Sequence, residues 1–282
     1  MKIIPFLLAA VLASPLFAAP EVAFKKEGKG PGVVLIHGLG GNRDAWADIS
    51  KRLRTSHTVM SVDLPGHGES APPPLKEGAA DLDAIASEIA KLIRKQKLNP
   101  AILIGHGLSG AIAMRVALAD PGAVKGIILV DSSLTPFSKA YTDDFEKDLD
   151  TNASLAIGGF VGDLCNGDIQ KAKLMKEALK VPVPVLKAYA RALGKDTFAG
   201  RGASIRVPVT LFSSTVIPDP THEKDALKQL GMEGIPKLTV AYFVNVKHWI
   251  MWDDPDTFEI LFNDFETNLM GSGTGTGSGS SK

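Results

Sequence analysis

Short apolar runs alternate with segments of helical periodicity along most of the chain, and this alternation restricts the fold more than any other feature. The run GVVLIHG is almost unbroken in apolar residues, as is typical of a parallel strand covered on both faces. The segment DLDAIASEIAKLIRK instead places Leu82, Ile85 and Ile89 along one helical face. The same reasoning predicts strands at HTVMSVD, AILIG, VKGIILVD, VPVTLF and LTVAYFV, and helices at NRDAWADISKRLR, LSGAIAMRVALAD, HEKDALKQL and PDTFEILFNDFETNL. The pattern predicts an α/β fold with a doubly wound, mostly parallel sheet and right-handed crossovers.

The alternation stops between Leu134 and about Gly202, where helical pieces and a VPVPV run occur without a clear strand. We interpret residues 134–202 as a helical cap inserted between two strands of one domain at residues 20–270. The cap contains Phe160, Val161, Leu164 and the VPVPV run. These apolar residues favour a small apolar ester or acyl ligand, since ligand pockets are lined mainly by apolar side chains.

The two ends of the chain are expected to lie outside this domain. Residues 1–19 combine Lys2, an apolar run and small residues near Ala18, which is the pattern of a secretory signal peptide. The protein is therefore expected to be exported, periplasmic or secreted. The apolar run is too short for a stable membrane span, although an uncleaved anchor is the alternative. Residues 271–282, GSGTGTGSGSSK, have the composition of a flexible tail.

Composition excludes several classes of function. The 31 basic residues balance the 31 acidic residues, so the chain lacks the basic surface expected of a nucleic-acid-binding protein. Cys165 is the only cysteine, which excludes an intramolecular disulfide and leaves a buried, unreactive thiol as its expected state. We find no zinc-like His spacing and no G-x-G-x-x-G fingerprint, so we expect no metal and no cofactor.

Four short motifs follow predicted strands in a fixed order. They are HGLGG at residues 37–41, DLPGHGES at 63–70, GHGLSG at 105–110 and KHWIMWDDP at 247–255. Each lies where ligands bind in open α/β sheets, beyond the carboxyl ends of the strands. In this order the motifs resemble the α/β-hydrolase superfamily, and in particular its serine esterases and lipases. The resemblance spans nearly all of residues 31–270 and implies hydrolysis of a carboxylic ester.

The resemblance assigns a general base and leaves its acidic partner open. His248, in the last motif, corresponds to the histidine that takes a proton from the serine and returns it to the leaving group. Asp131 follows the strand GIILV, and Asp219 lies in the loop after the strand VPVTLF. Either aspartate could orient His248, and the residues alone do not choose between them.

The backbone N–H groups of Leu39 and Leu108 correspond to the family's oxyanion hole. Such donors stabilise the charge that develops on a carbonyl oxygen, and losing one raises the barrier by about 3 kcal/mol. Gly38 allows the backbone to approach a ligand closely. The resemblance makes His37 and His106 supporting hydrogen-bonding residues.

The nucleophile is missing from the motif that should carry it. In the pattern G-x-S-x-G the middle residue is the attacking serine, and here it is Gly107. Ser109 comes two residues into the next helix, so it should point about 200° away from the nucleophile position. Three interpretations follow: an engineered inactive hydrolase, a natural non-catalytic protein that binds a ligand or partner, or a hydrolase with an altered mechanism. In each, carboxylesterase activity is expected to be absent or very weak.

Overall fold

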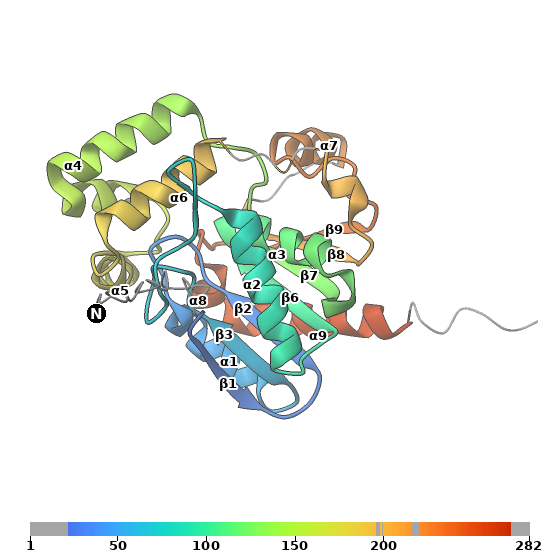
Figure 1. Ribbon diagram of the computed structural model, residues 1–282. Helices are drawn as coiled ribbons and strands as arrows, with labels where there is room; N and C mark the ends of the chain where they lie inside the picture. Colours follow the sequence, from blue (N-terminus) through green and yellow to red (C-terminus); the bar gives the residue numbers. More distant parts are fainter. Residues whose placement is uncertain (1–21, 196–197, 199, 216–219, 272–282) are drawn as a thin grey trace, which may run out of the picture.

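The computed structural model describes residues 22–195, 198, 200–215 and 220–271. Its centre is a seven-stranded sheet (Figure 1) with the order β1-β3-β2-β6-β7-β8-β9. Only β1 runs antiparallel to its neighbour, and the other pairs are parallel. The predicted fold class is confirmed. The strands are β1 (Phe24–Gly28), β2 (Gly32–Ile36), β3 (Thr58–Val62), β6 (Ala101–His106), β7 (Val124–Val130), β8 (Val209–Ser213) and β9 (Leu238–Tyr242).

Strand β1 and a small hairpin are additions to the predicted elements. The sequence of β1, FKKEG, contains three charged residues, because β1 is an edge strand whose side chains are partly solvated. It therefore lacks the apolar run that identified the central strands. The hairpin pairs β4 (Leu75–Lys76) with β5 (Ala79–Ala80).

Helices cover both faces of the sheet, as a doubly wound fold requires (Figure 1). The pair α2 and α3 lies on one face, and α1 and α9 lie on the other. These helices and their neighbours are α1 (Ala47–Leu53), α2 (Leu82–Lys95), α3 (Leu108–Ala119), α7 (Pro220–Gln229), α8 (Ile250–Asp253) and α9 (Pro255–Gly271). Short 3₁₀ turns occur at η1 (Arg43–Trp46), η2 (Pro121–Ala123) and η3 (Gly202–Ser204).

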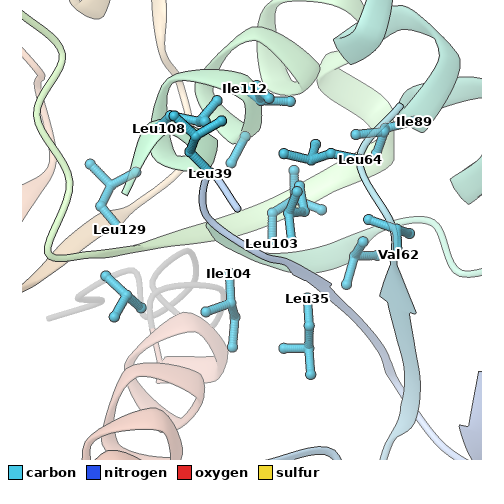
Figure 2. Close-up of a cluster of buried hydrophobic side chains, with 14 of the residues drawn as sticks. Leu35, Leu39, Val62, Leu64, Ile89, Leu103, Ile104, Leu108, Ile112 and Leu129 are labelled. Atoms are coloured by element: carbon cyan, nitrogen blue, oxygen red, sulfur yellow. The ribbon is translucent and has the colours of Figure 1, made fainter. Parts of the chain in front are cut away.

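The core consists of apolar side chains that alternate between the two faces of each central strand. In Figure 2, Leu103 points toward Ile112 of α3, whereas its neighbour Ile104 points to the opposite face, as does Leu35 of β2. All four side chains are fully buried. This two-sided burial explains why the central strands read as continuous apolar runs. It also makes the sheet a rigid platform for the loops at its carboxyl edge.

The cap consists of three helices between β7 and β8, which lie together above one end of the sheet (Figure 1). They are α4 (Lys139–Gly162), α5 (Asp168–Ala178) and α6 (Val183–Lys195). A kink divides α4 at Asn152, whose backbone is extended and whose side-chain oxygen accepts a hydrogen bond from Leu155 N–H. The VPVPV run leads into α6, because a proline in the first turn of a helix needs no N–H partner.

The predicted signal peptide at residues 1–19 lies outside the described residues, and so does the tail beyond Gly271. Within the described ranges, we find no helix with the length and apolar character needed to cross a bilayer.

Candidate active site

The segment predicted to carry the nucleophile forms a sharp turn between β6 and α3. Gly107 has φ +55° and ψ −122°, a backbone conformation that residues with a side chain rarely adopt. Two further glycines in the motif are required by close packing. A Cβ on Gly105 would lie 2.3 Å from the carbonyl oxygen of Ser109, and one on Gly110 would lie 2.4 Å from Ser132 Oγ. The turn therefore keeps the backbone geometry of a nucleophile elbow while presenting no nucleophile.

Asp131 and His248, separated by 117 positions in the sequence, meet at the carboxyl edge of the sheet. His248 Nδ1 lies 2.8 Å from Asp131 Oδ2. The other carboxylate oxygen accepts hydrogen bonds from Ser214 N–H at 3.0 Å and Ser214 Oγ at 2.7 Å. Burial would raise the pKa of Asp131, but the hydrogen bonds from His248 and Ser214 hold it below its ordinary value. An ionised carboxylate only accepts hydrogen bonds, so Nδ1 carries the proton and Nε2 has the free lone pair.

Gly107 lies beside that lone pair. A Cβ on Gly107 would lie 3.2 Å from His248 Nε2 and 3.5 Å from Cε1. A hydroxyl one bond further along the side chain would be within reach of Nε2. The geometry therefore places position 107 where a nucleophile would have to stand. The alternative acid, Asp219, lies outside the described residues.

Leu39 and Leu108, whose N–H groups are predicted to form the oxyanion hole, line the same cavity as Gly107 and His248. Leu108 is the first residue of α3, and the N–H groups of a first helical turn have no partner inside the helix. Leu39 lies in a turn closed by a hydrogen bond from Gly41 N–H to Gly38 O at 3.1 Å. Both donors are thus on backbone segments that hydrogen bonds and packing hold in place.

The predicted supporting histidines connect the loops around the cavity. His37 Nδ1 donates to Gly38 O at 2.8 Å, and its Nε2 accepts from Leu64 N–H at 2.9 Å. His106 Nε2 donates to the backbone oxygen of His248 at 3.0 Å. A Cβ on Gly38 would lie 2.8 Å from His106 Nδ1, so this position requires glycine. Burial lowers the pKa of His37 to about 4 and that of His106 well below its ordinary value, so both are neutral near pH 7.

Two polar residues near the motifs serve the fold rather than the cavity. Ser109 is fully buried and donates its hydroxyl to the backbone oxygen of His37, and it is absent from the residues that line the cavity. Asp63 accepts hydrogen bonds from the N–H groups of Arg43 and Glu69 and from the Arg43 guanidinium. The prediction that Ser109 points away from the nucleophile position agrees with this geometry.

A cavity of about 500 Å³ lies between the cap and the sheet, and most of the side chains that line it are apolar. Phe160 and Leu164 line it, as expected from the sequence. Val161 and the VPVPV run do not, and that part of the prediction is wrong. Val161 is buried within the cap, and Val185 packs against Gly66. The described residues that line it are Gly38, Leu39, His106, Gly107, Leu108, Asp131, Ser133, Thr135, Phe137, Ser138, Tyr141, Phe160, Leu164, Leu174, Leu193, His248 and Trp249.

Ser214 and Trp249 are site residues that sequence reasoning missed. Ser214 fixes Asp131, and Trp249 lines the cavity and packs against the His106 ring, with centroids 4.4 Å apart and the ring planes tilted by 53°. Ser214 directly follows β8 at the carboxyl edge of the sheet, and this position in the sequence could have identified it as a site residue. Across the described ranges, we find no group of three His, Cys, Asp or Glu side chains that could hold a metal ion.

Comparisons with known proteins agree with this geometry. The profile of the "Alpha/beta hydrolase family" matches residues 33–259. A pimeloyl-[acyl-carrier protein] methyl ester esterase from Pseudoalteromonas atlantica is 32% identical over an alignment of 202 residues that covers 64% of this chain and 74% of that protein. An uncharacterized protein of Mycobacterium tuberculosis is 34% identical over 110 residues, 39% of this chain but only 31% of the relative. The chain therefore matches less than a third of the length of that relative.

Among solved structures, a thermophilic esterase from Thermogutta terrifontis superimposes with a TM-score of 0.75. The match covers 89% of this chain and 94% of the esterase, at 20% sequence identity. At that identity the likeness concerns the fold.

Proposed function

The chain belongs to the alpha/beta hydrolase family, and from that premise we propose that its cavity is a carboxylic-ester hydrolase site that lacks only the attacking atom. With Gly107 in place, hydrolysis is absent or very weak. The observation that carries the proposal is the distance of 3.2 Å between His248 Nε2 and the position of a Cβ on Gly107. Asp131 and His248 are assigned as acid and base, and Leu39 and Leu108 as the backbone donors.

A serine at position 107 would complete the groups needed for ester hydrolysis through an acyl-enzyme. His248 Nε2 would take the hydroxyl proton while the serine oxygen attacks the ester carbonyl carbon. The N–H groups of Leu39 and Leu108 would stabilise the oxyanion, and His248 would then protonate the departing alcohol. Water would release the acid from the acyl-enzyme by the same base. Asp131 would hold the Nδ1 proton throughout and stabilise the imidazolium.

The cavity supports an apolar, uncharged ester or acyl ligand. Among the described residues that line it, the acidic and basic side chains are those of Asp131, His106 and His248. The Asp131 carboxylate is already occupied by His248 and Ser214. Within the part of the lining that the structure describes, no lysine or arginine is present to bind an anionic substrate. Leu, Phe and Trp side chains supply most of the remaining lining, which suits an acyl chain.

The second candidate function is binding without catalysis. It is favoured by the backbone of Gly107, because glycine adopts this conformation without the strain that a serine would carry. A chain that no longer needs the nucleophile loses nothing by this change and keeps the apolar cavity. The same observation fits a hydrolase disarmed by engineering.

The experiment that separates these functions compares the chain with its Gly107→Ser and Gly107→Ala variants on short and long 4-nitrophenyl esters. Alanine is the matched control, because it adds the same Cβ without the hydroxyl. We expect Gly107→Ser to hydrolyse the esters at least about 10³-fold faster than the other two proteins. A folded but silent Gly107→Ser variant would contradict the hydrolase assignment. Ligand-dependent shifts in melting temperature would then test the binding function.

Export is a separate part of the proposal and is supported by the pattern of residues 1–19. Expression of the full chain should give a mature protein in the periplasm or medium whose mass corresponds to loss of the first 18 or so residues. Full-length protein retained in the cell would contradict export.

A further inference from the structure

We propose that the chain with Gly107 uses its cavity for direct acyl transfer, in which a small O–H nucleophile attacks a bound ester without a covalent acyl-enzyme. The nucleophile is water or methanol. The inference rests on the proposed function, since it uses the same base, backbone donors and cavity. It goes further because it gives the protein an activity without a serine.

The first argument is the space beside the base. A Cβ on residue 107 would lie 3.2 Å from His248 Nε2, whereas an oxygen that donates a hydrogen bond to Nε2 must approach to about 2.9 Å. The two atoms would compete for nearly the same place. Glycine has only a hydrogen there, so an incoming oxygen can approach Nε2 from the side of residue 107. Any larger residue takes up part of that approach.

The second argument is the state of the base. Asp131 Oδ2 holds His248 Nδ1 at 2.8 Å, and two hydrogen bonds from Ser214 fix the carboxylate. Nε2 is therefore the nitrogen that accepts a proton, and it faces the cavity beside Gly107. This is the arrangement required of a general base, which contributes roughly 10²–10⁴-fold to such reactions.

The proposed step balances without any further reagent. The nucleophile oxygen forms a bond to the carbonyl carbon as Nε2 takes its proton, and the carbonyl electron pair moves onto the oxygen held by the N–H groups of Leu39 and Leu108. The carbonyl then re-forms, the bond to the original alcohol breaks, and that alcohol takes the proton from Nε2. Water gives the carboxylic acid and methanol gives the methyl ester.

The third argument concerns the hydroxyls of the protein itself. Ser109 is buried and bonded to His37 O. Ser133 and Thr135 bond to each other, and Thr135 also donates to Gln229 O. Ser138 accepts the N–H of Tyr141 at the start of α4. These contacts hold the serine and threonine hydroxyls in structural roles, so an external nucleophile is favoured over attack by one of them.

The expected size of the nucleophile follows from the space that the side chain of a serine at position 107 would occupy. A serine would place one carbon and one oxygen at this point, and methanol consists of the same heavy atoms. Methanol should therefore be accepted, whereas the branched 2-propanol should not. Gly105 and Gly110 are themselves closely packed against Ser109 and Ser132, so the turn that carries Gly107 is held in place.

The test measures acid and methyl ester formed from a 4-nitrophenyl acyl ester by the full chain, with methanol or 2-propanol added. We expect methyl ester above the buffer rate and no 2-propyl ester. His248→Ala should lose about 10²-fold of the rate, and Gly107→Ala about ten-fold or more. Gly234→Ala is the control, because Gly234 has φ +80° with no atom within 4 Å of an added Cβ, and its rate should equal that of the parent.

Several results would overturn the inference: transfer at the buffer rate, equal rates in His248→Ala, an undiminished rate in folded Gly107→Ala, or an acyl adduct on the protein by intact mass. If Gly107→Ala does not fold, the parent alone tests the inference: formation of the methyl ester without the 2-propyl ester supports it, and equal amounts of the two esters would overturn it. If the parent shows no acyl transfer but the Gly107→Ser variant hydrolyses the esters, this inference is wrong and the proposed function stands. Silence from Gly107→Ser as well rejects both.

Discussion

Replacement of Gly107 by alanine should lower the free energy of unfolding by about 2 kcal/mol. The backbone of Gly107 has φ +55° and ψ −122°, and a residue with a Cβ in such a region costs roughly 1–3 kcal/mol. The new Cβ would also lie 3.2 Å from His248 Nε2, so the imidazole would have to shift by a few tenths of an ångström. That shift is resisted by the 2.8 Å hydrogen bond to Asp131 and by the His106 ring, 4.3 Å away between centroids.

Urea unfolding at 25 °C measures this loss, with Gly234→Ala as the reference. Gly234 also has a positive φ, but a Cβ there would meet no atom within 4 Å, so only the left-handed backbone cost of about 1–2 kcal/mol applies. In a domain of this size, 2 kcal/mol corresponds to a fall in Tm of roughly 4–8 °C. Gly107→Ser should lose a similar amount, because its Cβ has the same position.

The contribution of His248 is separated by a double-mutant cycle. In the double variant Gly107→Ala with His248→Ala, the contact with the imidazole is removed and only the backbone cost remains. The alanine at position 107 should therefore cost less in that background than in the parent. An unfolding midpoint for Gly107→Ala equal to that of the parent would refute the reasoning, since neither the dihedral strain nor the contact would then exist.

Two further outcomes follow from the contacts of the site. In the Gly107→Ser background, Asp131→Asn should lower kcat by about 10⁴-fold, because an amide can stabilise the wrong imidazole tautomer; steady-state kinetics check this, and an unchanged kcat would remove Asp131 from the mechanism. Acid should destabilise the fold, because burial lowers the pKa of His37 to about 4, that of His67 to about 3, and that of His106 well below its usual value. The unfolded chain then binds more protons than the native protein below about pH 6.5, so each histidine removes about 1.4 kcal/mol of stability per pH unit as the pH falls. Urea midpoints at pH 7.5, 6.5 and 5.5 should fall progressively, and a flat profile would contradict the buried neutral state.

The fold was predictable because its signals are local. The continuous apolar runs of β2, β6 and β7 result from burial on both faces of the sheet. The buried residues of α2 recur every three or four positions, which is the period of a helix with one apolar face. Strand β1 was missed for the same reason. Its charged side chains are accommodated at a solvated sheet edge, and such a strand carries no apolar pattern of its own.

The residues of the cap that line the cavity could not be predicted from the sequence pattern. Its helical character and approximate bounds follow from the lost alternation, but helical periodicity does not say which face meets the cavity. Phe160 of α4 and Leu164 just after it line the cavity, whereas Val161 between them is buried within the cap. The VPVPV run is equally apolar and leads into α6, yet its residues are not among those that line the cavity. Composition alone cannot separate these cases, because apolar side chains serve packing and ligand binding equally well.

The sequence by itself determined the α/β alternation, the order of the motifs and the absence of a side chain at position 107, since each of these is written in contiguous residues. Only the tertiary structure brought Asp131 to His248 across 117 positions, added Ser214 as the group that fixes the carboxylate, and selected the residues that line the cavity. Those contacts depend on how the strands order themselves in the sheet and how the cap packs on it. Such long-range packing is set by the whole core and not by any local pattern.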